Sequence, residues 1–259
     1  MSEPTWYGHH QLPHGGAWFW QLGPLRLYVE NRQSEWRLGW RAERDHSLST
    51  SESGEVSPER LSEGTSARFA SRADEDSIAL GAALADRPVV VRPETPVWLL
   101  GGEEVDFFLS TPLWIRVSTA LTGRQLLDMP TFRPPDTWFG ANTREGELAY
   151  ASRTRAQREP MIHPFRAATR LTIINREPDA VRIERVQLPV PSLRLYLDAD
   201  GRFWTSPVVL ERTEAGFSGH LRILDTPPGE AHDARLVTEA RVPFRAQLGI
   251  VRALTALWT

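Results

Sequence analysis

The sequence contains no cysteine and no lysine. Without cysteine there are no disulfides, thiolate nucleophiles, cysteine-ligated zinc sites or iron–sulfur clusters. Without lysine, Schiff-base and pyridoxal chemistry and a Walker-type phosphate loop are excluded. The 30 residues counted as lysine or arginine are all arginine, which stays protonated and cannot replace lysine as a general base. Much of covalent and phosphoryl-transfer catalysis is therefore excluded, and we expect no cofactor.

The chain also lacks a long apolar run and a large net charge. No stretch approaches the roughly 18 apolar residues of a membrane-spanning helix, and residues 1–10 have neither the basic nor the apolar region of a signal peptide. A formal net charge of -3 provides no global field to attract nucleic acid or an anionic membrane. We therefore expect a cytoplasmic protein that does not bind nucleic acid.

What the chain does contain is an ordinary globular composition, with 41% hydrophobic and 24% charged residues. Apolar residues recur at every second position over residues 25–29, and the pattern resumes over residues 36–40 after a short polar break. Such alternation predicts a hairpin of half-buried strands. Asp200-Gly201 lies between two further apolar runs and predicts a second hairpin turn.

These patterns predict an all-β protein built as antiparallel β-sandwiches. We expect two sandwich units, over residues 1–125 and 136–259. Apolar residues at helical spacing predict a short helix at the C-terminus. Residues 43–76 are rich in Ser, Glu and Arg and poor in large apolar residues, which predicts a long surface loop, either between domains or inserted in one.

The ten tryptophans raise the possibility of a stacking surface for sugars, although tryptophan more often fills a core or anchors an interface. Trp36 and Trp40 belong to the apolar set of their strand, so we expect them in the core. Trp114 is out of phase with Leu113 and Ile115, and we expect it to be exposed.

Arginine is concentrated between residues 144 and 170. That stretch has six arginines against three glutamates. On one strand Arg153 and Arg155 would share a face, where they could clamp a carboxylate or phosphate. Trp138 and Phe139 could form the floor of such a site, with Arg144 nearby. The simpler alternative is a solvated face in a chain that uses arginine at every basic position.

Other polar groups suggest chemistry with less support. His9, His10 and His14 could supply nitrogen ligands to zinc, nickel or copper, but adjacent histidines diverge on a strand. Glu103 and Glu104 form a carboxylate pair, yet they follow a Gly-Gly turn and fit a solvated strand face equally well.

Several segments resemble an uncharacterised prokaryotic family. Thr137-Trp138-Phe139-Gly140 is the most specific of them, and it is accompanied by residues 146–150, 188–193 and 203–205. The family is the domain of unknown function family four-three-two. The resemblance implies no established activity and no catalytic residues. It does imply an accessory or regulatory role, because relatives lie near mechanosensitive-channel genes, and hence an association with a membrane channel.

Two hypotheses for function follow. The first is a non-catalytic cytoplasmic β-sandwich that binds a partner protein, a second copy of itself or a small anionic ligand through Arg153, Arg155 and Trp138. The second is a metal-assisted or carboxylate-based hydrolase acting on a carbohydrate-like substrate. That alternative needs His163 or another remote ligand to join the N-terminal histidines, or a partner for Glu103 and Glu104. The absence of strong catalytic motifs favours the first hypothesis.

Overall fold

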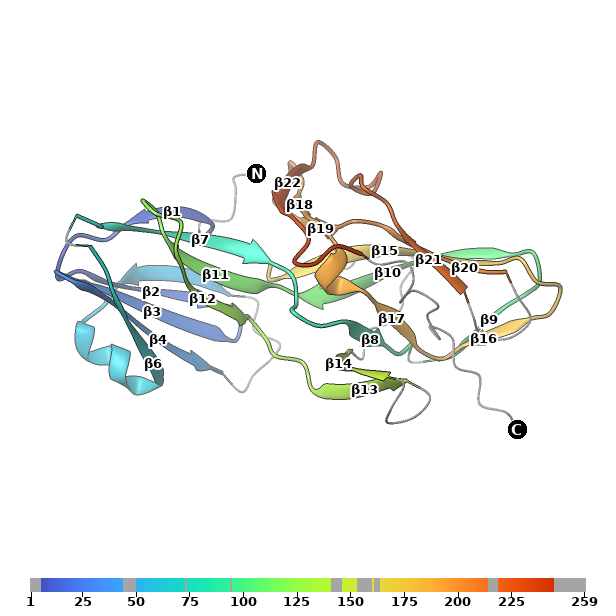
Figure 1. The fold of residues 1–259 in the computed structure, drawn as a ribbon, viewed down its shortest axis with the longest axis horizontal. Helices are drawn as coiled ribbons and strands as arrows, with labels where there is room; N and C mark the ends of the chain where they lie inside the picture. The colour runs from blue at the N-terminus through green and yellow to red at the C-terminus, as the bar shows by residue number, and fades with distance from the viewer. Residues whose placement is uncertain are drawn as a thin grey trace. The chain divides into compact units, whose positions relative to one another are not determined.

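The computed structural model describes residues 6–43, 50–72, 74–93, 95–140, 146–152, 160, 164–213 and 219–244, without the side chains of residues 61–63. The described chain is all-β, as predicted, and its helical content is limited to the 3-10 helices η1 (Pro58–Glu63) and η2 (Val190–Ser192) (Figure 1). The predicted C-terminal helix lies outside the described residues.

The chain forms two compact units, each assembled from separate stretches of sequence. Unit 1 comprises Met1–Ala83, Pro112–Arg133 and His163–Phe165. Unit 2 comprises Leu84–Thr111, Pro134–Ile162 and Arg166–Thr259. The units therefore differ from the continuous ranges 1–125 and 136–259 expected from the sequence, because strands distant in sequence pair with one another.

Unit 1 contains two antiparallel sheets. In sheet order, the four-stranded sheet consists of β1 (Gly8–Gln11), β7 (Ser77–Ala83), β11 (Trp114–Thr119) and β12 (Gln125–Pro130). The five-stranded sheet consists of β5 (Ser51–Glu55), β2 (Ala17–Leu22), β3 (Leu25–Arg32), β4 (Glu35–Ala42) and β6 (Thr65–Ala70). The predicted hairpin over residues 25–40 is the β3–β4 pair.

The two sheets of unit 1 are joined by a buried core and by a buried amide. Trp20 and Trp36 of the five-stranded sheet are fully buried, as is Leu80 of the other sheet. Asn31 on β3 is also fully buried, and its Nδ2 donates to the carbonyls of Leu12 and Glu75 at 2.7 and 3.3 Å. Because an unpaired buried amide is costly, these bonds fix the end of β3 against the segments beside β1 and β7.

The prediction that residues 43–76 form a loop is wrong for half of that segment. β5 pairs with β2 and β6 pairs with β4, so both are the edges of the five-stranded sheet, and η1 lies between them. Polar edge strands bury little side-chain area but gain a backbone ladder on one side. The polar composition of these residues therefore predicts correctly that they are exposed, but not that they form strands.

Unit 2 contains a seven-stranded sheet with mixed strand directions. Its path is β21 (Gly219–Ile223), β20 (Val208–Arg212), β15 (Arg166–Asn175), β19 (Phe203–Thr205), β18 (Leu195–Leu197) and β22 (Arg235–Thr238), and β10 (Glu104–Pro112) also pairs with β15. β15 runs parallel to both β19 and β20. A two-stranded sheet is formed by β9 (Val97–Leu99) and β16 (Val181–Ile183).

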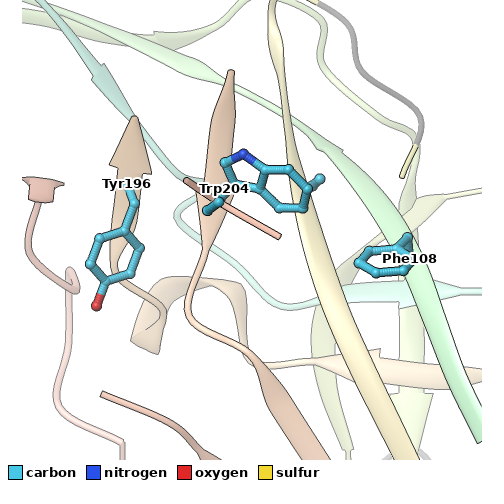
Figure 2. Packing of buried hydrophobic residues seen from close by; sticks show 5 residues of the cluster. Phe108, Tyr196 and Trp204 are labelled. Atoms are coloured by element: carbon cyan, nitrogen blue, oxygen red, sulfur yellow. The ribbon is translucent and has the colours of Figure 1, made fainter. Parts of the chain in front are cut away.

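One face of the seven-stranded sheet carries an aromatic cluster (Figure 2). Phe108, Tyr196 and Trp204 are buried there together with Ala168 and Ala231. The rings of Phe108 and Trp204 meet edge to face, with centroids 6.4 Å apart. The cluster ties β10, β15, β18 and β19 to the segment that leads to β22.

Trp114 is buried, with 3% of its surface exposed, and not exposed as we expected. It begins β11, whose inward face is formed by Ile115 and Val117, both fully buried. Alternation of apolar residues shows which residues share a face of the strand. It does not show that both faces are covered at the first residues of β11, which is why Trp114 is buried.

Asp198 organises the turn between β18 and β19, where Asp200-Gly201 predicted one. Its Oδ1 accepts from the amides of Asp200 and Arg202 at 3.0 and 2.8 Å, and its Oδ2 accepts from Trp204 Nε1 at 2.8 Å. Gly201 has φ +78, a conformation that favours glycine. One buried carboxylate therefore fixes the turn and the aromatic cluster together.

We expect Asp198→Ala to lower the free energy of unfolding by about 2–4 kcal/mol, because three donors lose their acceptor in a buried setting. Asp200→Ala is the control, since its exposed carboxylate only pairs with Arg202 at 3.4 Å and its loss should cost less than about 0.5 kcal/mol. Denaturant unfolding followed by tryptophan fluorescence measures both. Equal effects would contradict the role given to Asp198.

Candidate anion-binding site

The candidate site is built on the four-stranded sheet of unit 2. In order, its strands are β13 (Asp136–Gly140), β14 (Gly146–Ser152), β8 (Val89–Val91) and β17 (Val186–Leu188) (Figure 1). β8 is paired on both edges, parallel to β14 and antiparallel to β17. Its three valines are at most 2% exposed, as expected of a strand between two neighbours.

This pairing sets two arginines side by side. Val91 pairs with Val186, so the same register one residue further puts Arg92, after β8, opposite Arg185, before β17. The amide of Arg92 also donates to the carbonyl of Ser152 at 3.2 Å, which extends the β14–β8 ladder to this position. Like charges at directly opposite positions of a sheet repel each other.

The electrostatics of Arg185 agree with this placement. Burial lowers the pKa of its guanidinium below the ordinary value, and the charge of Arg92 lowers it further. Glu184 acts in the opposite sense but does not outweigh the other two effects. A pKa shifted by burial together with a specific neighbouring charge is a feature of functional sites.

The floor under Arg185 is aromatic. The guanidinium carbon lies 5.0 Å from the centroid of the Phe139 ring, and Phe139 is buried with Val90 and Ala149. A guanidinium stacked on a ring keeps its N–H groups in its own plane, directed away from the ring. Arg185 can therefore stack and bind an oxyanion at the same time.

The structure brings one of the predicted ligand-binding residues to this site. Phe139 lies under Arg185, whereas the sequence hypothesis placed it under Arg153 and Arg155. Its neighbour Trp138 pairs with Leu148 across β13 and β14, and both side chains are 44% exposed. Alternation along β13 puts Trp138 on the face opposite Phe139. Arg144, Arg153 and Arg155 lie outside the described residues.

The three N-terminal histidines are not gathered into a metal centre. His9 and His14 are exposed, while His10 packs edge-on against Trp20 and its Nε2 lies 2.9 Å from the carbonyl of Trp6. Adjacent positions on β1 direct His9 and His10 to opposite faces. Within the described residues no group of three His, Asp or Glu side chains could hold a metal ion, and His163 is not described.

The carboxylates considered for hydrolysis are not arranged as an acid–base pair. Glu103 and Glu104 are exposed beside the Gly101-Gly102 turn. The neighbouring Asp106 accepts from Arg170 Nη2 at 2.8 Å and from Thr172 at 2.5 Å. These bonds, with that from Arg170 the larger contribution, hold the pKa of Asp106 below its usual value, so it remains an ionised structural partner.

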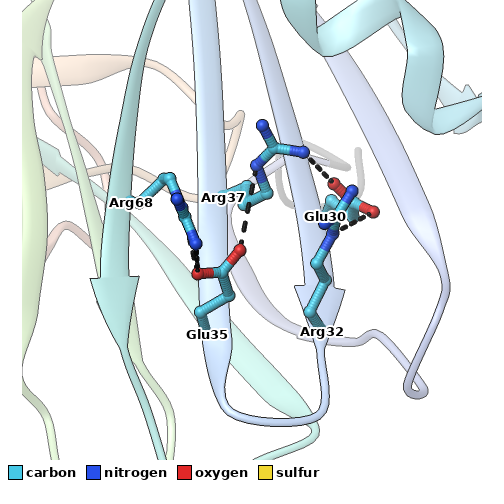
Figure 3. A network of polar contacts seen from close by, with 5 residues as sticks. All are labelled: Glu30, Arg32, Glu35, Arg37 and Arg68. Atoms are coloured by element: carbon cyan, nitrogen blue, oxygen red, sulfur yellow. Dashed lines mark hydrogen bonds and ion pairs between the residues drawn. The ribbon is translucent and has the colours of Figure 1, made fainter.

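A charge network on β3, β4 and β6 of unit 1 has matched charges (Figure 3). Glu30 lies 2.9 Å from Arg32 and 3.6 Å from Arg37, and Glu35 pairs with Arg68 at 2.5 Å. Every arginine in this network has a carboxylate, which leaves little attraction for an external anion.

Sequence reasoning missed Arg92 and Arg185 because they are far apart in the chain and only strand pairing joins them. A partial signal was available. Arg92 follows a short apolar run, the three consecutive valines of residues 89–91. Such a run is typical of a strand with neighbours on both sides. The identity of those neighbours and the register were not predictable.

A family model for proteins of unknown function, DUF432, matches residues 6–254. The chain belongs to this family. The family predicted from residues 135–140 and their companions is therefore confirmed, and the DUF432 match includes every described strand from β1 to β22 in both units. No curated protein and no solved structure matches the chain. Among the described residues of this DUF432 member, no helix is long and apolar enough to cross a membrane.

We expect Gly146→Ala to disturb the β13–β14 hairpin and lower the free energy of unfolding by about 1–3 kcal/mol. A Cβ at this position would lie 2.5 Å from Trp138 Nε1 and 2.7 Å from the Phe139 carbonyl oxygen. Gly81→Ala is the control, because its Cβ would meet its nearest neighbour only at 3.9 Å. Denaturant unfolding would contradict the assignment if both variants were equally stable.

We expect Arg68→Gln to raise the pKa of Glu35, since the hydrogen bond from Arg68 is the main cause that lowers it below the ordinary 4.5. Because the folded pKa is the lower one, this pair stabilises the fold above about pH 4.5 and the stabilisation is lost as the pH falls. Carboxyl carbon NMR titration measures the shift. Arg41→Gln should leave Glu35 unchanged, and an unshifted Glu35 in the Arg68 variant would contradict the pairing.

Proposed function

We propose that this protein is a non-catalytic binding protein whose ligand is a small oxyanion, held between Arg92 and Arg185 above Phe139. The observation that supports it is the like-charged pair at opposite positions of β8 and β17. An anion between two guanidiniums turns their repulsion into two charge-assisted contacts, which are stronger than neutral hydrogen bonds. The same guanidiniums could also bind a carboxylate or phosphate group on a partner protein. Binding of a partner protein is the other form of the first hypothesis.

The proposal includes Arg153 from the arginine-rich segment. Arg153 directly follows Ser152 in the sequence, and Ser152 pairs with Val91, the residue before Arg92. A third guanidinium, supplied by Arg153, would favour a multiply charged oxyanion such as phosphate over a monoanion. Catalysis forms no part of the proposal, because the two arginines and the aromatic ring support binding alone.

We expect inorganic phosphate to bind the wild-type protein in isothermal titration calorimetry at low salt, and Arg185→Gln to weaken that binding at least about tenfold. Arg87→Gln is the matched control. Arg87 lies 5.4 Å over the ring of Tyr150 in the same sheet, but it is paired with Asp136 at 3.1 Å.

The proposal predicts that the control binds phosphate like the wild type and that Arg92→Gln behaves like Arg185→Gln. Binding that is absent from the wild type, or weakened equally by Arg87→Gln and Arg185→Gln, would overturn it. Arg153→Gln tests the third arginine separately, with weakened phosphate binding expected.

A further inference from the structure

Arg166, the first residue of β15, is a largely buried cation whose described hydrogen-bond partners are neutral. Its Nε donates to Ser110 Oγ at 2.7 Å and its Nη2 donates to the Ser110 carbonyl, also at 2.7 Å. Both acceptors are neutral. Burial lowers the pKa of Arg166 to about 10. In the described part of the chain no carboxylate forms an ion pair with it, although a desolvated charge normally requires one.

Arg170 provides the comparison on the same strand. It is four residues further along β15, so both side chains project from the same face. Arg170 is paired with Asp106 at 2.8 Å and with Glu230 at 3.4 Å, and the hydrogen bond that it donates to Asp106 is the main cause that raises its pKa. The described residues therefore supply two carboxylates to the less desolvated arginine and none to Arg166.

The contacts with Ser110 also define which edge of the guanidinium is available. A guanidinium has five N–H donors in one plane. Ser110 accepts from Nε and from Nη2, which occupies the side edge. The end edge, formed by Nη1 and the second N–H of Nη2, has no hydrogen-bond partner among the described residues. That edge presents two parallel donors, the arrangement that matches the two oxygens of a carboxylate.

We propose that Arg166, positioned by Ser110, is a binding site for a small organic carboxylate. The end edge of the guanidinium donates two hydrogen bonds to the carboxylate oxygens, and a single positive charge matches a single negative one. The partial exposure of Arg166 leaves access from solvent. Its residues belong to β10 and β15, so it does not depend on the oxyanion site of Arg92 and Arg185.

The test uses acetate as the probe and the arginine Nε–H signals of 15N-labelled full-length protein. We expect the Arg166 signal, assigned by its loss in Arg166→Gln, to shift along a saturating curve as acetate replaces chloride at constant ionic strength. The Arg170 signal should stay in place because its carboxylates are already present. A shift of Arg166 that does not saturate, or an equal shift of Arg170, would overturn the proposal.

Two further variants keep the test decisive if Arg166→Gln does not fold. Arg166→Lys retains the charge but loses the two-donor edge. Acetate binding to this variant is measured as the rise in its thermal unfolding temperature with acetate, relative to chloride at the same concentration. Half-saturation should need at least about tenfold more acetate than in the wild type. Ser110→Ala should weaken acetate binding less than that, while the charge remains. If Arg166→Lys matched the wild type, the edge would have no role and the proposal would fail. Phosphate binding at Arg185 should be unchanged in both variants.

Discussion

The double pairing of β8 is the constraint on which the rest of unit 2's candidate site depends. A strand with a ladder on each edge and buried side chains on both faces cannot shift its register without exposing its valines. Burying one valine is worth about 1.5–3 kcal/mol, whereas repulsion between opposite like charges in a sheet amounts to about 1 kcal/mol or less. Burial outweighs repulsion, and Arg92 is therefore held against Arg185.

The absence of lysine gives this electrostatic pattern its form. Every fixed cation in the chain is a planar fork, which can stack on a ring and donate hydrogen bonds at its edge simultaneously. Most described arginines in ion pairs use that edge on a carboxylate of the chain itself, as Arg87 does with Asp136 and Arg68 does with Glu35. Arg92 and Arg185 differ in lying opposite one another, and Arg166 has no ion pair with a carboxylate among the described residues.

The sequence was sufficient where structure is local. Alternation predicted the β3–β4 hairpin, and Asp200-Gly201 predicted the turn that Asp198 organises. The sequence was insufficient for the polar strand β5, which is held by backbone pairing and buries little side-chain area. It was also insufficient at Trp114, where the second face of the strand is covered. Of the candidate site, only Phe139 was predictable, because the register that joins β8 to β17 spans almost a hundred residues.

The division of the sequence between the two units has a consequence for modularity. The polypeptide passes from one unit to the other five times, after residues 83, 111, 133, 162 and 165. Neither unit corresponds to a continuous gene segment, so recombination cannot transfer one of them as a cassette. For the same reason, a single duplication or deletion of one continuous stretch of the gene cannot add or remove a whole unit.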